Sequence, residues 1–232
     1  MKILAMDSCF PRGGVALLDG ERLVARDGFE GPEGHVALLP QAVERLLAES
    51  GWSLAELERI AVTLGPGSFS GARIALGVAK GMASGIGLEV VGFSTLEVVA
   101  AGSNCDGSVA ALLDARRGEV YAAFYEIQLG QTPRLRSELL VCDPETLIGQ
   151  LRSWQASIDA PLHLTGNALG VYGERLQNLA EAGCRMAEEA FWPLNVALLG
   201  RLAARLGRGV RMPVEALEPV YVRKADAKEP AH

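Results

Sequence analysis

Three short apolar segments open the chain before any helical pattern begins. They comprise residues 3–6, 15–18 and 23–25. Turn-forming residues such as Pro11 and the Asp19-Gly20 pair separate them, which is typical of antiparallel strands. Apolar spacing then predicts helices alternating with buried strands. The predicted ranges are helix 33–50, strand 60–64, helix 72–84, strand 90–93 and helix 95–101. The resulting order, β-β-β-α-β-α-β-α, strongly limits the folds that this chain can adopt.

The second half of the chain repeats this pattern coarsely. Asp114 ends a predicted strand at 110–113, as Asp7 ends the first strand, and further strands and helices follow. This order is ribonuclease-H-like and excludes a Rossmann arrangement. We therefore predict an actin-like ATPase fold with two lobes, each with a mixed sheet and flanking helices. The lobes are predicted at 1–104 and 105–232, and a final helix at about 194–206 could pack on either of them.

Composition argues against several classes of function. The net charge is -6, whereas a protein that holds nucleic acid by itself usually presents a basic face. The arginines between Arg201 and Arg211 are interpreted as a solvated helix face. The four cysteines form no C-x-x-C pair, and no apolar stretch approaches the roughly 20 residues that span a bilayer. We expect a cytoplasmic protein with no metal, no membrane contact and no stable tRNA binding of its own.

Two features could form a ligand site. Asp7 ends the first strand, where a carboxylate could face metal and phosphate, or could instead cap the turn that follows. The segment Gly65–Gly71 is glycine-rich and precedes a helix, as in sites where backbone approaches an anion, but it lacks P-loop and dinucleotide spacing. A vestigial or composite nucleotide site is therefore predicted at Asp7, Gly65, Gly67 and Ser68.

Small residues recur every four positions along the helix predicted at 72–84. One row consists of Gly77, Gly81 and Gly85, and alanines form another. Such rows let a second helix approach closely, either within this chain or in another subunit. With the apolar rows of the helix at 33–50, they predict a partner interface. Its predicted residues are Leu38, Ala42, Leu46, Ala75, Ala79, Met82 and Ala83.

Several motifs resemble one known family. The chain begins I-L-A-M-D-S (3–8) and continues with G-P-G-S-F-S-G-A-R-I (65–74), D-A-R-R-G-E-V-Y (114–121) and P-V-Y-V-R (219–223). These resemble the bacterial TsaB (YeaZ) family over essentially the whole chain. The resemblance implies an actin-like fold and a part in forming N6-threonylcarbamoyladenosine at position 37 of tRNAs that read ANN codons. The implied partners are the catalytic subunit TsaD and the ATPase TsaE, with homodimers when the chain is alone.

Departures from the catalytic relative imply a role without catalysis. The resemblance implies that Thr95 and Val99 stand where the catalytic subunit has its two histidine metal ligands, and neither can replace an imidazole. Arg116 follows Asp114 where a phosphate loop needs glycine, and the Gly-Gly adenosine motif is reduced to Gly166. We expect no cofactor, except a nucleotide at a partner junction. The alternatives are an ATP-dependent small-molecule kinase or ATPase of the same fold, and a metalloprotease-like protein.

Overall fold

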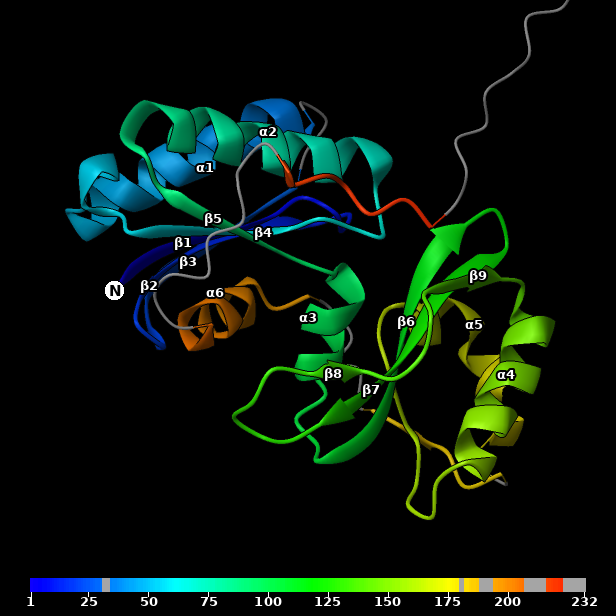
Figure 1. The fold of residues 1–232 in the computed structure, drawn as a ribbon. Helices are drawn as coiled ribbons and strands as arrows, with labels where there is room; N and C mark the ends of the chain where they lie inside the picture. Colours follow the sequence, from blue (N-terminus) through cyan, green and yellow to red (C-terminus); the bar gives the residue numbers. More distant parts are fainter. Residues whose placement is uncertain (31–33, 180–181, 188–193, 207–215, 223–232) are drawn as a thin grey trace, which may run out of the picture.

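The computed structural model describes residues 1–30, 34–179, 182–187, 194–206 and 216–222 of this chain. These residues form two separate β-sheets, each covered by helices (Figure 1). No helix in this part of the chain is long and apolar enough to cross a membrane.

The first sheet has the strand order β3-β2-β1-β4-β5. The elements of this lobe are β1 (Lys2–Asp7), β2 (Gly13–Asp19), β3 (Arg22–Phe29), α1 (His35–Ser50), β4 (Arg59–Thr63), α2 (Phe69–Ile86), β5 (Glu89–Phe93) and α3 (Thr95–Ala101). The first three strands are antiparallel, whereas β4 and β5 run parallel to β1. The element order predicted for this half of the chain is confirmed.

The second sheet is built around a long hairpin, with the order β11-β10-β6-β7-β8 and β9 also paired with β7. Its strands are β6 (Gly107–Arg116), β7 (Glu119–Ile127), β8 (Arg134–Leu135), β9 (Leu140–Cys142), β10 (His163–Thr165) and β11 (Arg185–Met186). Two helices accompany them, α4 (Pro144–Ala156) and α5 (Ala168–Leu176). The sequence pattern does not predict β8 and β11, because a strand of two residues has no detectable period.

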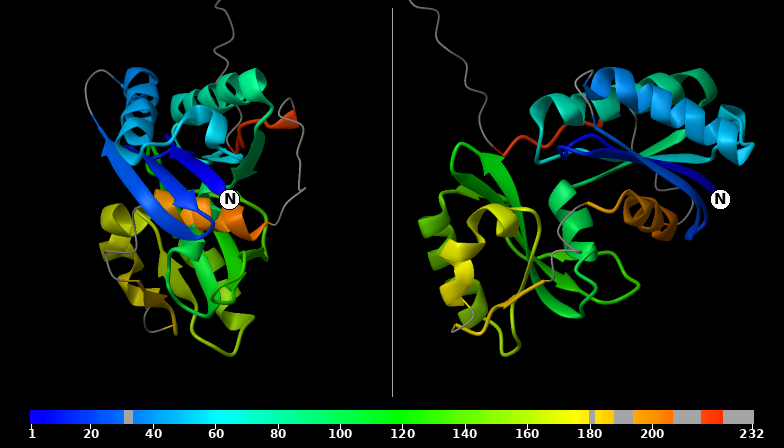
Figure 2. Two further views of the ribbon diagram at one scale, coloured as in Figure 1. Left: turned by 90° about the vertical axis from the view of Figure 1, so that its left-hand side faces the viewer. Right: turned by 180° about the vertical axis from the view of Figure 1, so that it is seen from behind.

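Each sheet is the middle layer of three. The helices α1 and α2 cover one face of the first sheet and α6 (Val196–Arg205) covers the other, while α3 and the pair α4 and α5 enclose the second sheet (Figure 2). Neighbouring residues of β1 therefore enter different cores. Leu4 and Met6 pack beneath α1 and α2, whereas Ile3 and Ala5 pack against α6. Burial on both faces explains why these strands are almost continuously apolar.

The last helix joins the first sheet, which settles a question that the sequence leaves open. Arg59 is 0% exposed, pairs with Glu89 at 2.7 Å, and donates a hydrogen bond to the carbonyl of Ala203 in α6. The predicted lobe boundary at 104–105 falls between α3 and β6, yet α3 packs on the second sheet. Elements from each half of the chain thus contact the sheet of the other half.

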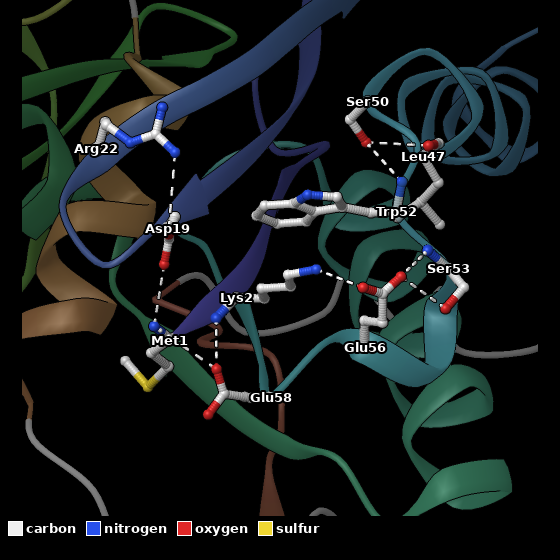
Figure 3. A network of polar contacts seen from close by, with 10 residues as sticks. All are labelled: Met1, Lys2, Asp19, Arg22, Leu47, Ser50, Trp52, Ser53, Glu56 and Glu58. Carbon is white, nitrogen blue, oxygen red and sulfur yellow. Dashed lines mark hydrogen bonds and ion pairs between the residues drawn. The ribbon is translucent and has the colours of Figure 1, made fainter.

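A network of ion pairs holds the connection between α1 and β4 against β1 (Figure 3). The Nζ atom of Lys2 lies 2.5 Å from Oε1 of Glu56 and 4.5 Å from the centroid of the Trp52 ring. The hydrogen bond from Lys2 holds the pKa of Glu56 down to about 2. Glu56 also accepts hydrogen bonds from the backbone and hydroxyl of Ser53, which closes a capping box on the short helix Leu54–Glu56.

Candidate functional site

A cleft of about 520 Å³ opens between the two sheets. The turn after β1 and the first residues of α1 and α2 form one wall, and the end of β6 with Asn167 forms the other. Gly67 and Ser68 line this cleft, whereas Asp7 and Gly65 are not among its lining residues. The structure thus brings two of the four predicted nucleotide-site residues to the cleft.

Asp7 caps the turn that follows it. Its Oδ1 accepts a hydrogen bond from the N–H of Cys9 at 3.0 Å and another from the Thr63 hydroxyl, and its Oδ2 accepts one from the N–H of Phe10 at 3.4 Å. Burial raises the pKa of Asp7, and the Thr63 hydrogen bond opposes that rise. Of the two interpretations that the sequence allows, the structure supports the structural one, because both oxygens are engaged within the fold.

The glycines of the segment 65–71 allow close contact with the turn after β1. A Cβ atom on Gly67 would lie 2.7 Å from the carbonyl oxygen of Cys9, and one on Gly71 only 1.8 Å from that of Ser8. Ser68 N–H donates to the Cys9 carbonyl at 2.9 Å, and the Ser68 side chain caps α2 by accepting from Gly71 N–H. Packing within this chain therefore accounts for the loop glycines, without any phosphate.

On the opposite wall of the cleft, the polar side chains bind to one another. Asp114 accepts hydrogen bonds from the N–H of Arg116 at 2.9 Å and from the Tyr172 hydroxyl at 3.3 Å. Arg116 and Arg117 both have positive φ, 62° and 53°, a conformation that L residues seldom adopt. The Arg116 side chain also pairs with Asp114 at 3.6 Å. This turn thus places bulky side chains where a phosphate loop would present backbone.

A serine–histidine contact lies beside the cleft, and the sequence pattern does not reveal it. Ser8 Oγ is 2.8 Å from Nδ1 of His35, and Nε2 of His35 is 3.1 Å from the Pro11 carbonyl oxygen. Nδ1 of His35 also lies 3.3 Å from the Ser8 carbonyl oxygen, so each ring nitrogen faces a backbone carbonyl. The pair resembles a nucleophile and its base. Ser8 is 0% exposed, however, so the contact instead ties the start of α1 to the turn.

The positions aligned with the metal ligands of the catalytic relative are in the core. Thr95 and Val99 are both buried in α3. Across the described ranges, no three His, Cys, Asp or Glu side chains lie together as a metal site.

Glu97 on α3 is a carboxylic acid whose pKa lies near neutral pH. Burial raises the pKa of Glu97 from 4.5 to about 7, against the opposing effect of a hydrogen bond from the Ser94 backbone. Well below pH 4.5 the carboxyl is neutral in both the folded and the unfolded chain. As the pH rises towards 7, the unfolded chain ionises first, and the folded state loses stability relative to it.

We therefore expect Glu97→Gln to remove part of the pH dependence of folding. Between about pH 5 and pH 8 the native chain should lose on the order of 2–3 kcal/mol more stability than the variant. Denaturant unfolding at both pH values measures this difference. Glu138→Gln, at an exposed position, is the control and should follow the native chain. If Glu97→Gln loses as much stability as the native chain, Glu97 ionises normally in the fold.

Most residues predicted for the partner interface face inward. Five of the seven are buried in this chain's own core, where they pack against the first sheet: Ala42, Leu46, Ala75, Ala79 and Ala83. Leu38 and Met82 are partly buried at the edge of the same core. These five residues leave almost no exposed surface for a partner, because the alanine row of α2 covers its own sheet, and the partner interface stays a prediction.

The outward face of α2 carries the glycine row instead. Gly77, Gly81 and Gly85 are exposed, and no described atom lies within 4 Å of a Cβ atom built on any of them. Each glycine inside a helix costs about 1 kcal/mol relative to alanine. Gly149 on α4 has the same open surroundings, but it is a single residue. No packing among the described residues explains the three aligned glycines, so the alternative of contact with another subunit gains weight.

Comparison with known proteins identifies the family. A family model described as TsaD: tRNA N6-adenosine threonylcarbamoyltransferase matches residues 31–230. The tRNA threonylcarbamoyladenosine biosynthesis protein TsaB of Haemophilus influenzae is 31% identical over 167 residues, 66% of this chain and 69% of that protein. The chain belongs to the TsaB (YeaZ) family. TsaB of Bacillus subtilis is 28% identical over 232 residues, which cover 98% of this chain and 96% of the relative.

Solved structures agree with this assignment. YeaZ from Pseudomonas aeruginosa superposes with a TM-score of 0.77 at 29% identity, covering 95% of this TsaB-family chain and 99% of that one. A ROK hexokinase from Thermus thermophilus has the same fold, with a TM-score of 0.54 at 16% identity, over 88% of this chain and 98% of that chain. The predicted actin-like ATPase fold is confirmed.

Proposed function

We propose that this chain is a non-catalytic partner subunit in the formation of N6-threonylcarbamoyladenosine at position 37 of ANN-decoding tRNAs. In this proposal it pairs with a TsaD-type catalytic subunit and works with a TsaE-type ATPase. Its curated relatives are named tRNA threonylcarbamoyladenosine biosynthesis proteins, which supports the pathway.

The exposed glycine row of α2 is the observation that carries the pairing. Gly77, Gly81 and Gly85 lie one helical turn apart with open space above them, so a partner helix could approach the α2 backbone closely. Burial of surface against such a partner would offset the unfavourable free energy of placing glycine inside a helix. In the absence of the partner, two copies of this chain could pair through the same row.

The state of the cleft supports a role without catalysis. Asp7 accepts a hydrogen bond within its own turn, and Asp114 accepts hydrogen bonds from Arg116 and Tyr172. The loop glycines pack closely against the turn after β1. A kinase or ATPase of this fold would need backbone open to phosphate on the wall where Arg116 stands. That wall argues against the kinase alternative, and the hexokinase likeness concerns the fold alone.

A reconstituted reaction tests this function. The family resemblance implies threonylcarbamoyl-AMP as the donor. We expect purified TsaD- and TsaE-type subunits, given this donor, ATP and unmodified tRNA, to form the modified nucleoside only when this chain is added. Mass spectrometry of digested tRNA measures the product. This chain with tRNA and donor alone is the control and should form none. Product from this chain alone would mean that it is an enzyme, and full product without it would remove the proposed role.

A further inference from the structure

Three side chains form an exposed patch where α2 begins, and we call Phe69, Arg73 and Tyr221 the aromatic–arginine patch. Phe69 and Tyr221 are 47% and 48% exposed, and their ring centroids lie 5.1 Å apart. The Arg73 guanidinium carbon lies 3.8 Å from the centroid of Phe69 and 5.6 Å from that of Tyr221. Two motifs far apart in the sequence, 65–74 and 219–223, thus meet at one surface.

Arg73 is held in place but has donors to spare. Its Nε donates to the Tyr221 hydroxyl at 2.9 Å, and a guanidinium has five N–H donors in all. Among the described residues it forms no ion pair. The first turn of α2 contains no acidic residue, and the helix dipole places partial positive charge there. The patch is therefore positive on a chain whose net charge is -6.

The aromatic–arginine patch is not needed to hold the segment 216–222 in place. That segment is already fixed by burial of Leu217 in the core and by the hydrogen bond from Val220 N–H to the Leu64 carbonyl at 2.7 Å. A free arginine side chain loses substantial rotamer entropy when it binds, and the two rings restrict Arg73 in advance. Aromatic residues and arginine also dominate the binding energy of protein interfaces.

We propose that the aromatic–arginine patch binds a carboxylate of the protein partner that packs along α2. Arg73 lies four residues before Gly77 on α2, so the patch borders the N-terminal end of the glycine row. This inference rests on the proposed function, and the partner is the TsaD-type subunit. Single-stranded RNA can also use aromatic rings and arginine. The net charge of the chain disfavours RNA here, and the experiment below separates the two.

The test compares Arg73→Glu with Arg73→Lys and with Arg152→Glu, a charge-matched control at an exposed position on α4. Calorimetry measures the Kd for the purified TsaD-type subunit. We expect Arg73→Glu to weaken binding at least about tenfold, or about 1.4 kcal/mol. Arg73→Lys should fall between it and the native chain, and Arg152→Glu should bind normally. Raising salt from about 0.05 to about 0.5 M should shrink the difference, because added ions screen the charges.

Tyr221→Phe tests whether Arg73 binds the partner or only holds the segment 216–222 against α2. The variant removes the hydrogen bond between Tyr221 and Arg73 and keeps the ring. It should change the Kd by less than about threefold, a small free-energy difference. If Tyr221→Phe weakens binding as much as Arg73→Glu, the patch is only a tether. If Arg73→Glu binds the subunit normally while Gly81→Trp does not, the patch proposal fails and the pairing on α2 stands. If Arg73→Glu affects only tRNA binding, the ligand is RNA and the carboxylate proposal is overturned.

Discussion

Gly81→Trp is expected to abolish association with a TsaD-type subunit while the free chain stays folded. The substitution adds an indole on the exposed face of α2, at a position where a Cβ atom has no neighbour from another described element within 4 Å. A partner helix packed on the glycine row would have no room for it, since such contacts depend on backbone approach. Calorimetry with the purified subunit, alongside thermal unfolding of the free variant, measures both effects.

Two controls make this result specific. Gly81→Ala should stabilise the free chain by about 1 kcal/mol, because alanine is the better helix former and its Cβ meets nothing. Gly149→Trp places the same indole on an exposed glycine of α4, a helix that packs on the second sheet, and should leave association intact. Normal binding by Gly81→Trp, or equal loss in Gly149→Trp, would show that the row is not the contact surface.

Gly71→Ala is expected to destabilise the protein strongly, although it adds only one methyl group. The new Cβ atom would lie 1.8 Å from the carbonyl oxygen of Ser8, a residue that is 0% exposed. Relieving that overlap requires α2 to move away from β1, which should cost more than about 3 kcal/mol of a stability that is typically 5–15 kcal/mol.

Gly77→Ala, on the outward face of the same helix, is the matched control for Gly71→Ala. It should raise the midpoint of thermal unfolding, since alanine favours the helix and no described atom opposes its Cβ. Circular dichroism during heating compares the two variants. A midpoint for Gly71→Ala within a few degrees of the native chain would mean that the loop and the turn after β1 are less closely packed than the structure indicates.

The fold could be predicted from the sequence because its strands and helices carry strong patterns. The start of α2 was harder to place, since Phe69-Ser70-Gly71 resembles the glycine-rich turn before it. Ser68, a good N-cap residue, is the signal that identifies Phe69 as the first helical residue. The edge strands β8 and β11 are too short to leave a pattern.

The orientation of α2 decided which interface residues could be predicted. Its alanine and glycine rows have the same spacing, so periodicity alone cannot say which row faces the sheet. Alanine is the more apolar residue, and Ala75 and Ala79 are indeed buried while Gly77 and Gly81 are exposed. The aromatic–arginine patch could not be predicted, because Arg73 and Tyr221 are 148 positions apart and meet only in the folded chain.

The most direct test of this account is sedimentation of the native chain with the purified TsaD-type subunit of the same organism. The account predicts a discrete complex at micromolar concentrations, which corresponds to about -8 kcal/mol of binding free energy. The same mixture prepared with Gly81→Trp should sediment as separate proteins. Two results together would contradict the proposed role as a partner subunit. The native chain would sediment separately from the TsaD-type subunit, and that subunit would form the modified nucleoside in the absence of this chain.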